Sequence, residues 1–257
     1  MSERTIIVTG GASGIGAACV HTLLSQGWYV WALDRQGEAL QRLADETQSS
    51  RLITAEIDIT QENEIDVAFE KFEGPVVAGL VNSAGIARDT PFMETTAEMF
   101  RSVFEVNVVG ASMIAQRAVR AMEGRDGSIV HVGSVSGLAG NVGRSAYGAS
   151  KAALINITRI MAVELAARGV RVNAVAPGPI ETPLARDLHT ESVRRRWKDR
   201  IPLQRYGTPV EIAEVCAFLL SEKSGYITGQ IIAVDGGFCA AGLMPEPRTH
   251  AQDELGL

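Results

Sequence analysis

The stretch TIIVTGGASGIG, residues 5–16, joins a run of β-branched and apolar residues directly to a glycine-rich turn. The run from Thr5 to Thr9 is typical of a strand that is buried on both faces. The segment that begins at Gly14 has the apolar spacing of a helix. Glycine lets a backbone approach a ligand closely, and the N-terminus of a helix favours an anionic group such as a pyrophosphate. The stretch therefore predicts a strand-turn-helix unit that binds a dinucleotide.

This turn departs from the usual G-x-G-x-x-G spacing. Counted from Gly10, that rule needs glycine where Ala12 and Ile15 stand, and the glycines follow the pattern G-x-x-x-G-x-G instead. Glycines can also serve a tight turn that binds nothing, but the strand before it and the helix after it favour a binding site. The residues that we expect to contact the dinucleotide here are Gly10, Ser13, Gly14, Ile15 and Gly16.

Short apolar runs and longer helical patterns alternate along the chain. The runs predict seven strands, at residues 5–9, 29–33, 52–57, 76–81, 128–132, 170–175 and 230–234. Apolar strands that are separated by crossover helices form parallel sheets covered on both faces. We therefore predict a single doubly wound α/β domain, residues 1–239, with a seven-stranded parallel sheet and helices on both faces. Residues 240–257 lack apolar periodicity and are predicted to form a C-terminal tail.

Composition excludes several classes of function. The 257 residues, 46% of them hydrophobic, suffice for one large core. A net charge of −6 gives no overall attraction to nucleic acid or to an anionic membrane. The chain has no signal-peptide pattern and no run of about 18 apolar residues, so we expect a cytoplasmic protein with no nucleic-acid or membrane partner. Cys19, Cys216 and Cys239 lack metal-ligand spacing, and neither a disulfide framework nor a metal site is predicted.

Asp34 ends the second predicted strand, twenty residues after Gly14. A carboxylate at this place can accept hydrogen bonds from the adenosine ribose, and it would repel the additional 2′-phosphate of NADP. The neighbouring Arg35 could pair with that phosphate if its side chain turned inward. The repulsion between like charges favours NAD as the cofactor, with NADP as the less favoured one.

Tyr147 and Lys151 stand four positions apart in SAYGASK, residues 145–151, near the start of a predicted helix. Residues at this spacing lie on the same side of a helix, although the pair is common on helix surfaces. A phenol with a pKa near 10 is a weak base at neutral pH, and a nearby ammonium group stabilises its phenolate. Beside a dinucleotide, such a pair can move the proton while the nicotinamide accepts a hydride from an alcohol.

Seven short motifs follow one another along the chain. They are TGGASGIG, NSAG (82–85), VNVVG (106–110), GSVSG (133–137), YGASK (147–151), PGPIETP (177–183) and ITGQIIAVDGG (227–237). Each motif is weak by itself. Together, in this order and spacing from Thr5 to about Phe238, they resemble the NAD(P)-dependent short-chain dehydrogenase/reductases, in the branch of about 250 residues.

The resemblance implies a Rossmann fold and a catalytic set of Asn107, Ser134, Tyr147 and Lys151. Tyr147 would be the general acid/base, and Lys151 would also bind the ribose of the nicotinamide. Ser134, thirteen residues before Tyr147, would hydrogen-bond the substrate oxygen, with Ser136 as a competitor in the same loop. In the family, the asparagine holds a water that links the lysine to a proton relay.

The resemblance also implies cofactor contacts at the carboxyl ends of other strands, the edge where doubly wound sheets bind ligands. By family precedent, Asp58 lies near the adenine, and Ile180 and Thr182 lie at the carboxamide of the nicotinamide. Besides the glycine-rich turn, Asp34 and Arg35, the residues expected to contact the cofactor are Asp58, Ile59, Asn82, Ala84, Gly85, Tyr147, Lys151, Pro177, Gly178, Ile180 and Thr182.

The resemblance identifies residues 183–208 as a lid over the substrate. The three consecutive arginines at 194–196 cannot all face one pocket, which favours a solvated helix face. We expect an oxidoreductase that interconverts a secondary alcohol and a ketone on a small-molecule substrate. The sequence leaves the identity of that substrate open.

Two other functions stay open. A 3-ketoacyl-acyl-carrier-protein reductase would use NADPH and would dock its acidic carrier on arginines at positions matching Arg125 and Arg168, although Asp34 conflicts with NADPH. A catalytically silent regulator that senses dinucleotides would need the glycine-rich turn but not Tyr147. The family also implies a homotetramer or homodimer, formed through helices at about 96–122 and 146–168.

Overall fold

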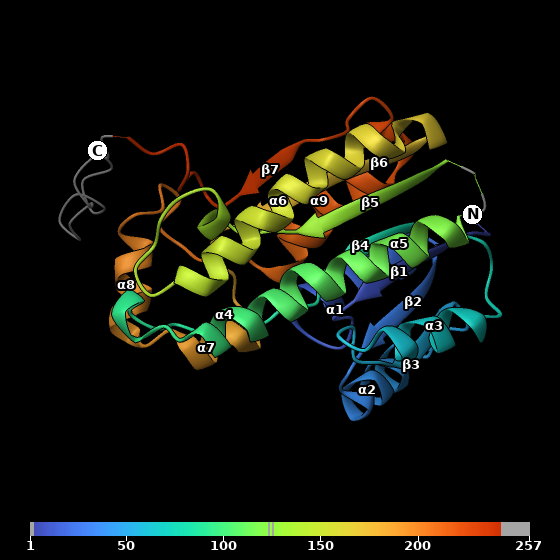
Figure 1. Ribbon diagram of the computed structural model, residues 1–257, viewed down its shortest axis with the longest axis horizontal. Helices are drawn as coiled ribbons and strands as arrows, with labels where there is room; N and C mark the ends of the chain where they lie inside the picture. The colour runs from blue at the N-terminus through green and yellow to red at the C-terminus, as the bar shows by residue number, and fades with distance from the viewer. Residues whose placement is uncertain (1–2, 123, 125, 243–257) are drawn as a thin grey trace, which may run out of the picture.

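The computed structural model describes residues 3–122, 124 and 126–242, and its centre is one parallel sheet (Figure 1). All seven predicted strands are present, in the order β3-β2-β1-β4-β5-β6-β7. Their bounds are β1 (Thr5–Thr9), β2 (Tyr29–Asp34), β3 (Leu52–Glu56), β4 (Val77–Asn82), β5 (Gly127–Val132), β6 (Val170–Pro177) and β7 (Ile231–Val234). Every neighbouring pair is parallel, so the predicted doubly wound sheet is confirmed.

Helices cover both faces of this sheet. Those described are α1 (Gly14–Ser25), α2 (Gly37–Thr47), α3 (Glu62–Glu70), α4 (Ala97–Phe104), α5 (Ala111–Ala121), α6 (Ser145–Leu165), α7 (Pro183–Leu188), α8 (Glu191–Lys198) and α9 (Pro209–Leu220). Short 3-10 turns are η1 (Phe92–Glu94), η3 (Val135–Gly137), η4 (Ala166–Arg168) and η5 (Glu222–Ser224), and η2 (Glu105–Gly110) is a π-helical turn between α4 and α5. Helices α1, α2 and α9 pack on one face, and α3, α5 and α6 pack on the other (Figure 1).

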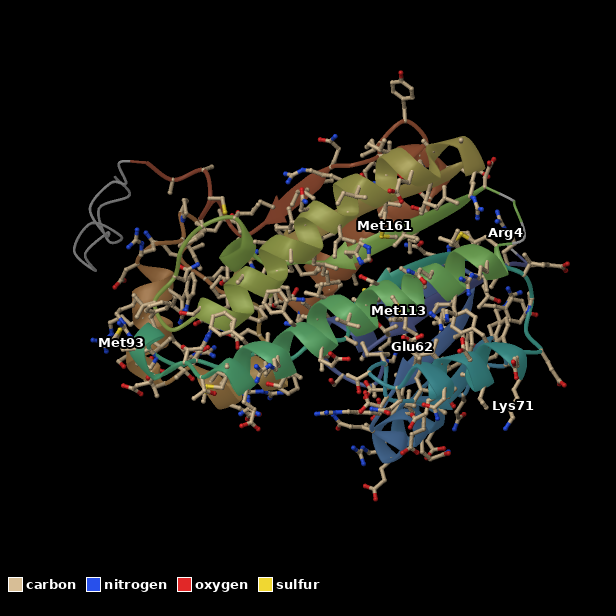
Figure 2. The ribbon with its side chains drawn as sticks, in the orientation of Figure 1. Arg4, Glu62, Lys71, Met93, Met113 and Met161 are labelled. Carbon is tan, nitrogen blue, oxygen red and sulfur yellow. The ribbon has the colours of Figure 1, made fainter. Side chains whose placement is uncertain are left out.

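The central strand β1 is buried along its whole length. Ile6 contributes to the core beneath α1 and α9, whereas its neighbour Ile7 contributes to the core beneath α5 and α6. A strand that is covered on both faces needs apolar side chains at successive positions, which explains the unbroken run in the sequence. Met113 of α5 and Met161 of α6, labelled in Figure 2, pack against the second of these cores.

The order of the strands reverses at β1, which pairs with β2 on one side and with β4 on the other. At such a switch point the connections leave in opposite directions, and a crevice opens beyond the carboxyl ends of the strands. The glycine-rich turn after β1 lies at this edge. The fold therefore places the predicted dinucleotide site where the sheet is open.

The excursion at residues 183–208 contains α7 and α8. Thr182 caps α7 by accepting a hydrogen bond from the amide of Ala185, and Thr190 caps α8 in the same way through Val193. The part of the chain that the structure describes contains no helix with the length and apolar character needed to cross a membrane.

Candidate active site

A cleft of about 720 Å³ runs along the carboxyl edge of the sheet. Its walls come from the turn after β1 and from the ends of β2, β4, β5 and β6, with α7 beside it. Most of the predicted site residues line it: Gly10, Ser13, Gly14, Ile15, Asp34, Arg35, Asp58, Ile59, Ala84, Gly85, Ser134, Tyr147, Lys151, Pro177, Gly178, Ile180 and Thr182. Gly16, Asn82 and Asn107 lie behind the wall rather than in it.

The glycines of the turn are required by close backbone contacts. Gly10 has a φ of +65°, and a Cβ on it would lie 2.9 Å from the backbone of Ala84. A Cβ on Gly16 would lie 2.0 Å from the carbonyl oxygen of Gly10, so only glycine lets α1 start this close to the turn. The side chain of Ser13, at the N-cap of α1, makes no capping hydrogen bond. Within the described part of the chain, the first amides of α1 therefore receive no cap from Ser13, which fits a pyrophosphate at this end of the cleft.

Asp34 is held beside this turn by two backbone amides. Its Oδ2 accepts a hydrogen bond from the amide of Ala12 at 3.1 Å, and its Oδ1 accepts one from the amide of Gln36, also at 3.1 Å. Each oxygen keeps a free lone pair for a ribose hydroxyl. Arg35 lines the same end of the cleft and is exposed. The carboxylate fits the adenosine ribose of a dinucleotide.

Asn82 stands behind the cleft instead of in it. Its Oδ1 accepts a hydrogen bond from Thr9 Oγ1 at 3.0 Å, and its Nδ2 donates one to the carbonyl of Ala111 at 2.7 Å. These bonds tie the end of β4 to β1 and α5. The next residues along the chain, including Ala84 and Gly85, form the wall itself.

Tyr147 lies in the first turn of α6 and faces the cleft. Burial raises the pKa of its phenol, and a hydrogen bond with the Ser134 side chain acts in the opposite direction on that pKa. Ser134 follows β5, and its Oγ also accepts a hydrogen bond from the amide of Ser136 at 3.1 Å. The hydroxyl of Ser136 instead accepts from Asn141 Nδ2 at 3.5 Å. The structure thus brings Ser134, rather than Ser136, to the tyrosine.

Lys151 lies one helical turn beyond Tyr147 and is only 4% exposed. Its Nζ donates a hydrogen bond to the carbonyl of Val132 at 2.8 Å and lies 5.8 Å from the centre of the Tyr147 ring. Burial lowers the pKa of Lys151 to about 8. The two side chains therefore share one helical face at the cleft, as the four-residue spacing predicts.

Asn107 lies in the π-helical turn η2 and is fully buried. Its Oδ1 accepts a hydrogen bond from the amide of Ile86 at 2.9 Å, and its Nδ2 donates to the carbonyl of Ile86 at 2.9 Å and to Ser150 Oγ at 3.0 Å. A Cβ on Gly85 would lie 3.1 Å from Asn107 Oδ1 and 3.4 Å from Lys151 Nζ. The missing side chain of Gly85 thus leaves the space between these two groups open.

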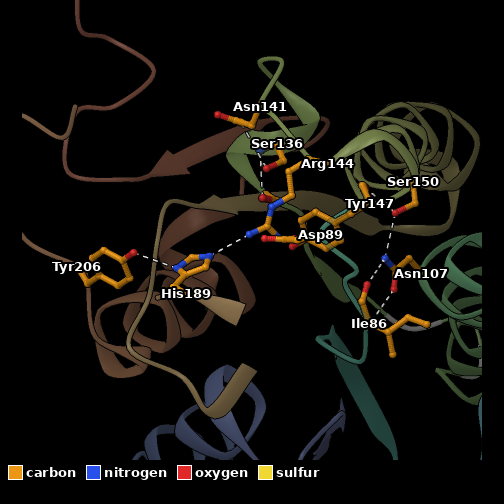
Figure 3. A network of polar contacts seen from close by, with 11 residues as sticks. Ile86, Asp89, Asn107, Ser136, Asn141, Arg144, Tyr147, Ser150, His189 and Tyr206 are labelled. Atoms are coloured by element: carbon orange, nitrogen blue, oxygen red, sulfur yellow. Dashed lines mark hydrogen bonds and ion pairs between the residues drawn. The ribbon is translucent and has the colours of Figure 1, made fainter. Parts of the chain in front are cut away.

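A polar network beside Tyr147 was missed by the sequence analysis (Figure 3). Arg144 Nη1 forms an ion pair with Asp89 Oδ1 at 3.0 Å, and Arg144 Nη2 lies 2.9 Å from His189 Nε2. His189 Nδ1 in turn lies 2.9 Å from the hydroxyl of Tyr206. The one available signal was the position of Arg144, three residues before Tyr147 in the chain.

Comparisons with known proteins show to which family the chain belongs. A model of the family described as Enoyl-(Acyl carrier protein) reductase matches residues 10–239. Carbonyl reductase family member 4 of Danio rerio is 41% identical over 237 residues, which cover 91% of this chain and 98% of the relative. The 3-oxoacyl-(acyl-carrier-protein) reductase FabG of Aquifex aeolicus is 40% identical over 243 residues, which cover 92% of this chain and 98% of the relative.

Solved structures that resemble this chain point to the same family. A short-chain type dehydrogenase/reductase from Mycobacterium marinum has a TM-score of 0.88 at 33% identity, with 93% of this chain and 97% of that chain covered. The structure of 4-hydroxyisoleucine dehydrogenase complexed with NADH has a TM-score of 0.86 at 31% identity, with 93% and 100% covered. The chain belongs to the short-chain dehydrogenase/reductase family, and the resemblance carried by its motifs is confirmed. It is therefore an oxidoreductase of the class that uses a nicotinamide dinucleotide.

Proposed function

We propose that this protein is an NAD-dependent enzyme that interconverts a secondary alcohol and a ketone on a small-molecule substrate, with Tyr147 as the general acid/base. The observation that carries the proposal is the meeting of the Tyr147 phenol and the Ser134 hydroxyl in one cleft with the glycine-rich turn. One end of that cleft fits a dinucleotide, and the other end presents groups that can move a proton.

In this proposal each residue has a distinct task. The bound nicotinamide supplies the acceptor or donor of the hydride. The first amides of α1 bind the pyrophosphate, and Asp34 accepts hydrogen bonds from the ribose. Ser134 donates a hydrogen bond to the substrate oxygen, and Tyr147 takes the proton from that oxygen during oxidation or returns it during reduction.

Lys151 and Asn107 support this proton transfer. A lysine with a pKa of about 8 is mostly protonated at neutral pH, so its charge favours the phenolate form of Tyr147. In the proposal the ammonium also holds the nicotinamide ribose. The open space at Gly85, between Asn107 and Lys151, suits a water that would pass the proton onward.

The test of the proposed reaction is a panel of secondary alcohols, sugars, hydroxy acids and steroids, with NADH formation as the signal. We expect at least one compound to be oxidised, and we expect Tyr147→Phe to lose about 10²- to 10⁴-fold in kcat because only the proton-carrying oxygen is removed. Binding of NAD to the variant, measured by calorimetry, should be largely kept. Undiminished turnover by Tyr147→Phe would contradict the assigned role.

The second candidate is a 3-oxoacyl-(acyl-carrier-protein) reductase that uses NADPH. It is supported by the relative of that name from Aquifex aeolicus and by the exposed Arg168 at the end of η4, where an acidic carrier could dock. The other arginine of this hypothesis, Arg125, lies outside the described residues. Reduction of a carrier-bound ketoacyl group with a strong preference for NADPH would replace the first candidate by this one.

The proposal extends to the organisation of the protein. Residues 1–239 act as one domain, the segment at 183–208 with α7 and α8 closes over the substrate, and the enzyme works in the cytoplasm as a homotetramer or homodimer. Ile160 and Val163 of α6, 48% and 80% exposed, offer an apolar surface for a second copy of the chain. Most of the tail expected at 240–257, from residue 243 onward, lies outside the described residues.

A further inference from the structure

Arg144 lies against the face of the ring of Tyr147. It occupies the N-cap of α6, and its guanidinium carbon lies 5.4 Å from the centre of that ring (Figure 3). The side chain of Arg144 is only 11% exposed. Arginine is rarely buried to this degree unless other groups fix it in place.

Two separate segments hold the guanidinium. Asp89 lies in the loop after β4 and pairs with Nη1 at 3.0 Å, while His189 follows α7 and meets Nη2 at 2.9 Å. A guanidinium can only donate hydrogen bonds, so His189 Nε2 must accept. The proton of the neutral imidazole is then on Nδ1, where it is donated to the hydroxyl of Tyr206 at 2.9 Å.

The surroundings of His189 suit this accepting role. Burial lowers the pKa of His189, and the neighbouring Arg144 and Arg194 lower it further. Asp89 and Glu181 act in the opposite direction on the same pKa. The imidazole is therefore neutral at neutral pH, and it leaves the charge of Arg144 intact.

The charged members of the network act on Tyr147 with opposite signs. Arg144 lowers the pKa of Tyr147, whereas Asp89 raises it. Lys151 is a second cation near the ring, but its Nζ is directed to the carbonyl of Val132 on the side of β5. Arg144 thus supplies positive charge from the lid side of the tyrosine, where α7 ends.

We propose that Arg144 is a positioning residue that acts through Tyr147: it fixes the ring against the cleft and stabilises the negative charge on the phenol oxygen when the proton leaves. Asp89 and His189 hold the guanidinium in the place where it can do so. The inference rests on the proposed acid/base role of Tyr147. It links the segment at 183–208 to the proton chemistry through His189.

The first experiment compares pH profiles of kcat/KM for alcohol oxidation. In Arg144→Gln the rise of kcat/KM with pH should move upward by about one pH unit, because a nearby positive charge is lost. At pH values below both midpoints this corresponds to an approximately tenfold loss. Arg144→Lys keeps the charge and should keep the profile. The control is Arg42→Gln, which removes an exposed arginine of α2 and should leave the profile unchanged.

Asp89→Asn gives a shift of opposite sign. Asparagine keeps an oxygen that can accept a hydrogen bond from Arg144 Nη1, so the guanidinium stays in place and only the charge that raises the pKa of Tyr147 is lost. The rise of kcat/KM should therefore move to lower pH. A merely structural role of Arg144 would reduce kcat equally in Arg144→Gln and Arg144→Lys without moving either profile. That result would overturn the inference.

A second measurement keeps the inference separate from the proposed reaction. The full-length protein is titrated by its tyrosinate ultraviolet absorbance, with and without the Tyr147→Phe substitution, so that the signal of Tyr147 is isolated from the other tyrosines. The midpoint for Tyr147 should be higher in the Arg144→Gln background than in the unmodified one. If no alcohol is turned over, the proposed function fails, but this titration still tests whether Arg144 lowers the pKa of Tyr147. An unmoved midpoint would overturn the inference about Arg144.

Discussion

The behaviour of single residues in the cleft is set by burial as much as by charge. Burial raises the pKa of Tyr147 and lowers the pKa of Lys151 to about 8, so each neutral form is favoured when the group stands alone. A buried tyrosine therefore reaches its charged form only with the help of neighbouring groups that lower its pKa. Ser134 and Arg144 supply them for Tyr147, since both lower its pKa.

In the proposed function, Asp34 is the residue on which the choice between NAD and NADP depends. In Asp34→Ala we expect the kcat/KM with NAD to fall about tenfold, since the ribose loses a charged acceptor. The kcat/KM with NADP should rise, because the repulsion of the 2′-phosphate is gone and Arg35 becomes available to it. Steady-state kinetics with both cofactors measure the ratio. An unchanged ratio would show that Asp34 does not discriminate between them.

For single residues, the sequence predicts which side chains lie at the cleft better than it predicts their hydrogen-bond partners. The spacing of Tyr147 and Lys151 was enough to place both side chains at one cleft. It could not show that Lys151 donates a hydrogen bond to Val132 or that Asn82 forms hydrogen bonds with Thr9 and Ala111. Those contacts join segments that are far apart in the chain. Arg144 was missed for the same reason.

Among the elements, the start of α1 is the most constrained. In Gly16→Ala the added methyl group would lie 2.0 Å from the carbonyl oxygen of Gly10, so α1 must move away from the turn. We expect NAD affinity to fall at least tenfold and the free energy of unfolding to fall by about 1–3 kcal/mol, a typical cost of overpacking. Calorimetry and denaturant unfolding measure the two effects.

Gly140→Ala is the matched control for this substitution. A Cβ on Gly140 would meet no heavy atom within 4 Å in the described structure. This variant should bind NAD as the unmodified protein does. If both alanine variants weakened NAD binding equally, the close contact at Gly16 would not be the cause.

The strands were predictable because each is a short apolar run, whereas other elements depend on tertiary contacts. The predicted helix at 96–122 is divided by η2, the π-helical turn that contains Asn107. Within α8, Arg194 turns to Glu181 and stacks on Tyr206, while Arg195 and Arg196 are exposed. The three arginines do not share one pocket, as expected, but Arg194 is half-buried and does not lie on the solvated helix face that the sequence favoured.

For the whole molecule, association through α6 is open to a direct test. Val163→Glu puts a charge on an apolar side chain that is 80% exposed. If α6 packs against its equivalent in a second copy, burial of that charge should dissociate the oligomer. Sedimentation velocity should then show a smaller species than for the unmodified protein. Val67→Glu, on the exposed side of α3, is the control and should leave the mass unchanged.

Stability should depend on acidity through His131. This side chain is fully buried on β5, its ring nitrogens have no hydrogen-bond partner among the described residues, and burial lowers its pKa to about 4. The unfolded chain binds this proton near pH 6.5, so between pH 6.5 and 4 it binds more protons than the folded chain. The free energy of unfolding should therefore fall as the pH falls through this window, by about 3 kcal/mol from His131.

Urea unfolding at a series of pH values measures this dependence. His131→Gln removes the titrating ring and should flatten the slope between pH 6.5 and 4. His21→Gln, which alters an exposed histidine of α1, should leave the slope unchanged. A His131→Gln protein with the original slope would assign the acid sensitivity to other groups.

The position of β1 in the sheet has a consequence for folding. β1 is the first strand along the chain, and its residue Ile6 pairs with Gly79 of β4. β1 therefore has a neighbouring strand on both sides only after β4 has been synthesised. The proposed dinucleotide cradle joins β1 to the segment after β4, since Gly10 lies against the backbone of Ala84, and both segments precede Tyr147 in the chain. A cofactor that binds this early would stabilise a half-finished sheet, since a ligand favours whichever state binds it. Availability of the dinucleotide should then affect the yield of folded protein during synthesis, independently of any turnover.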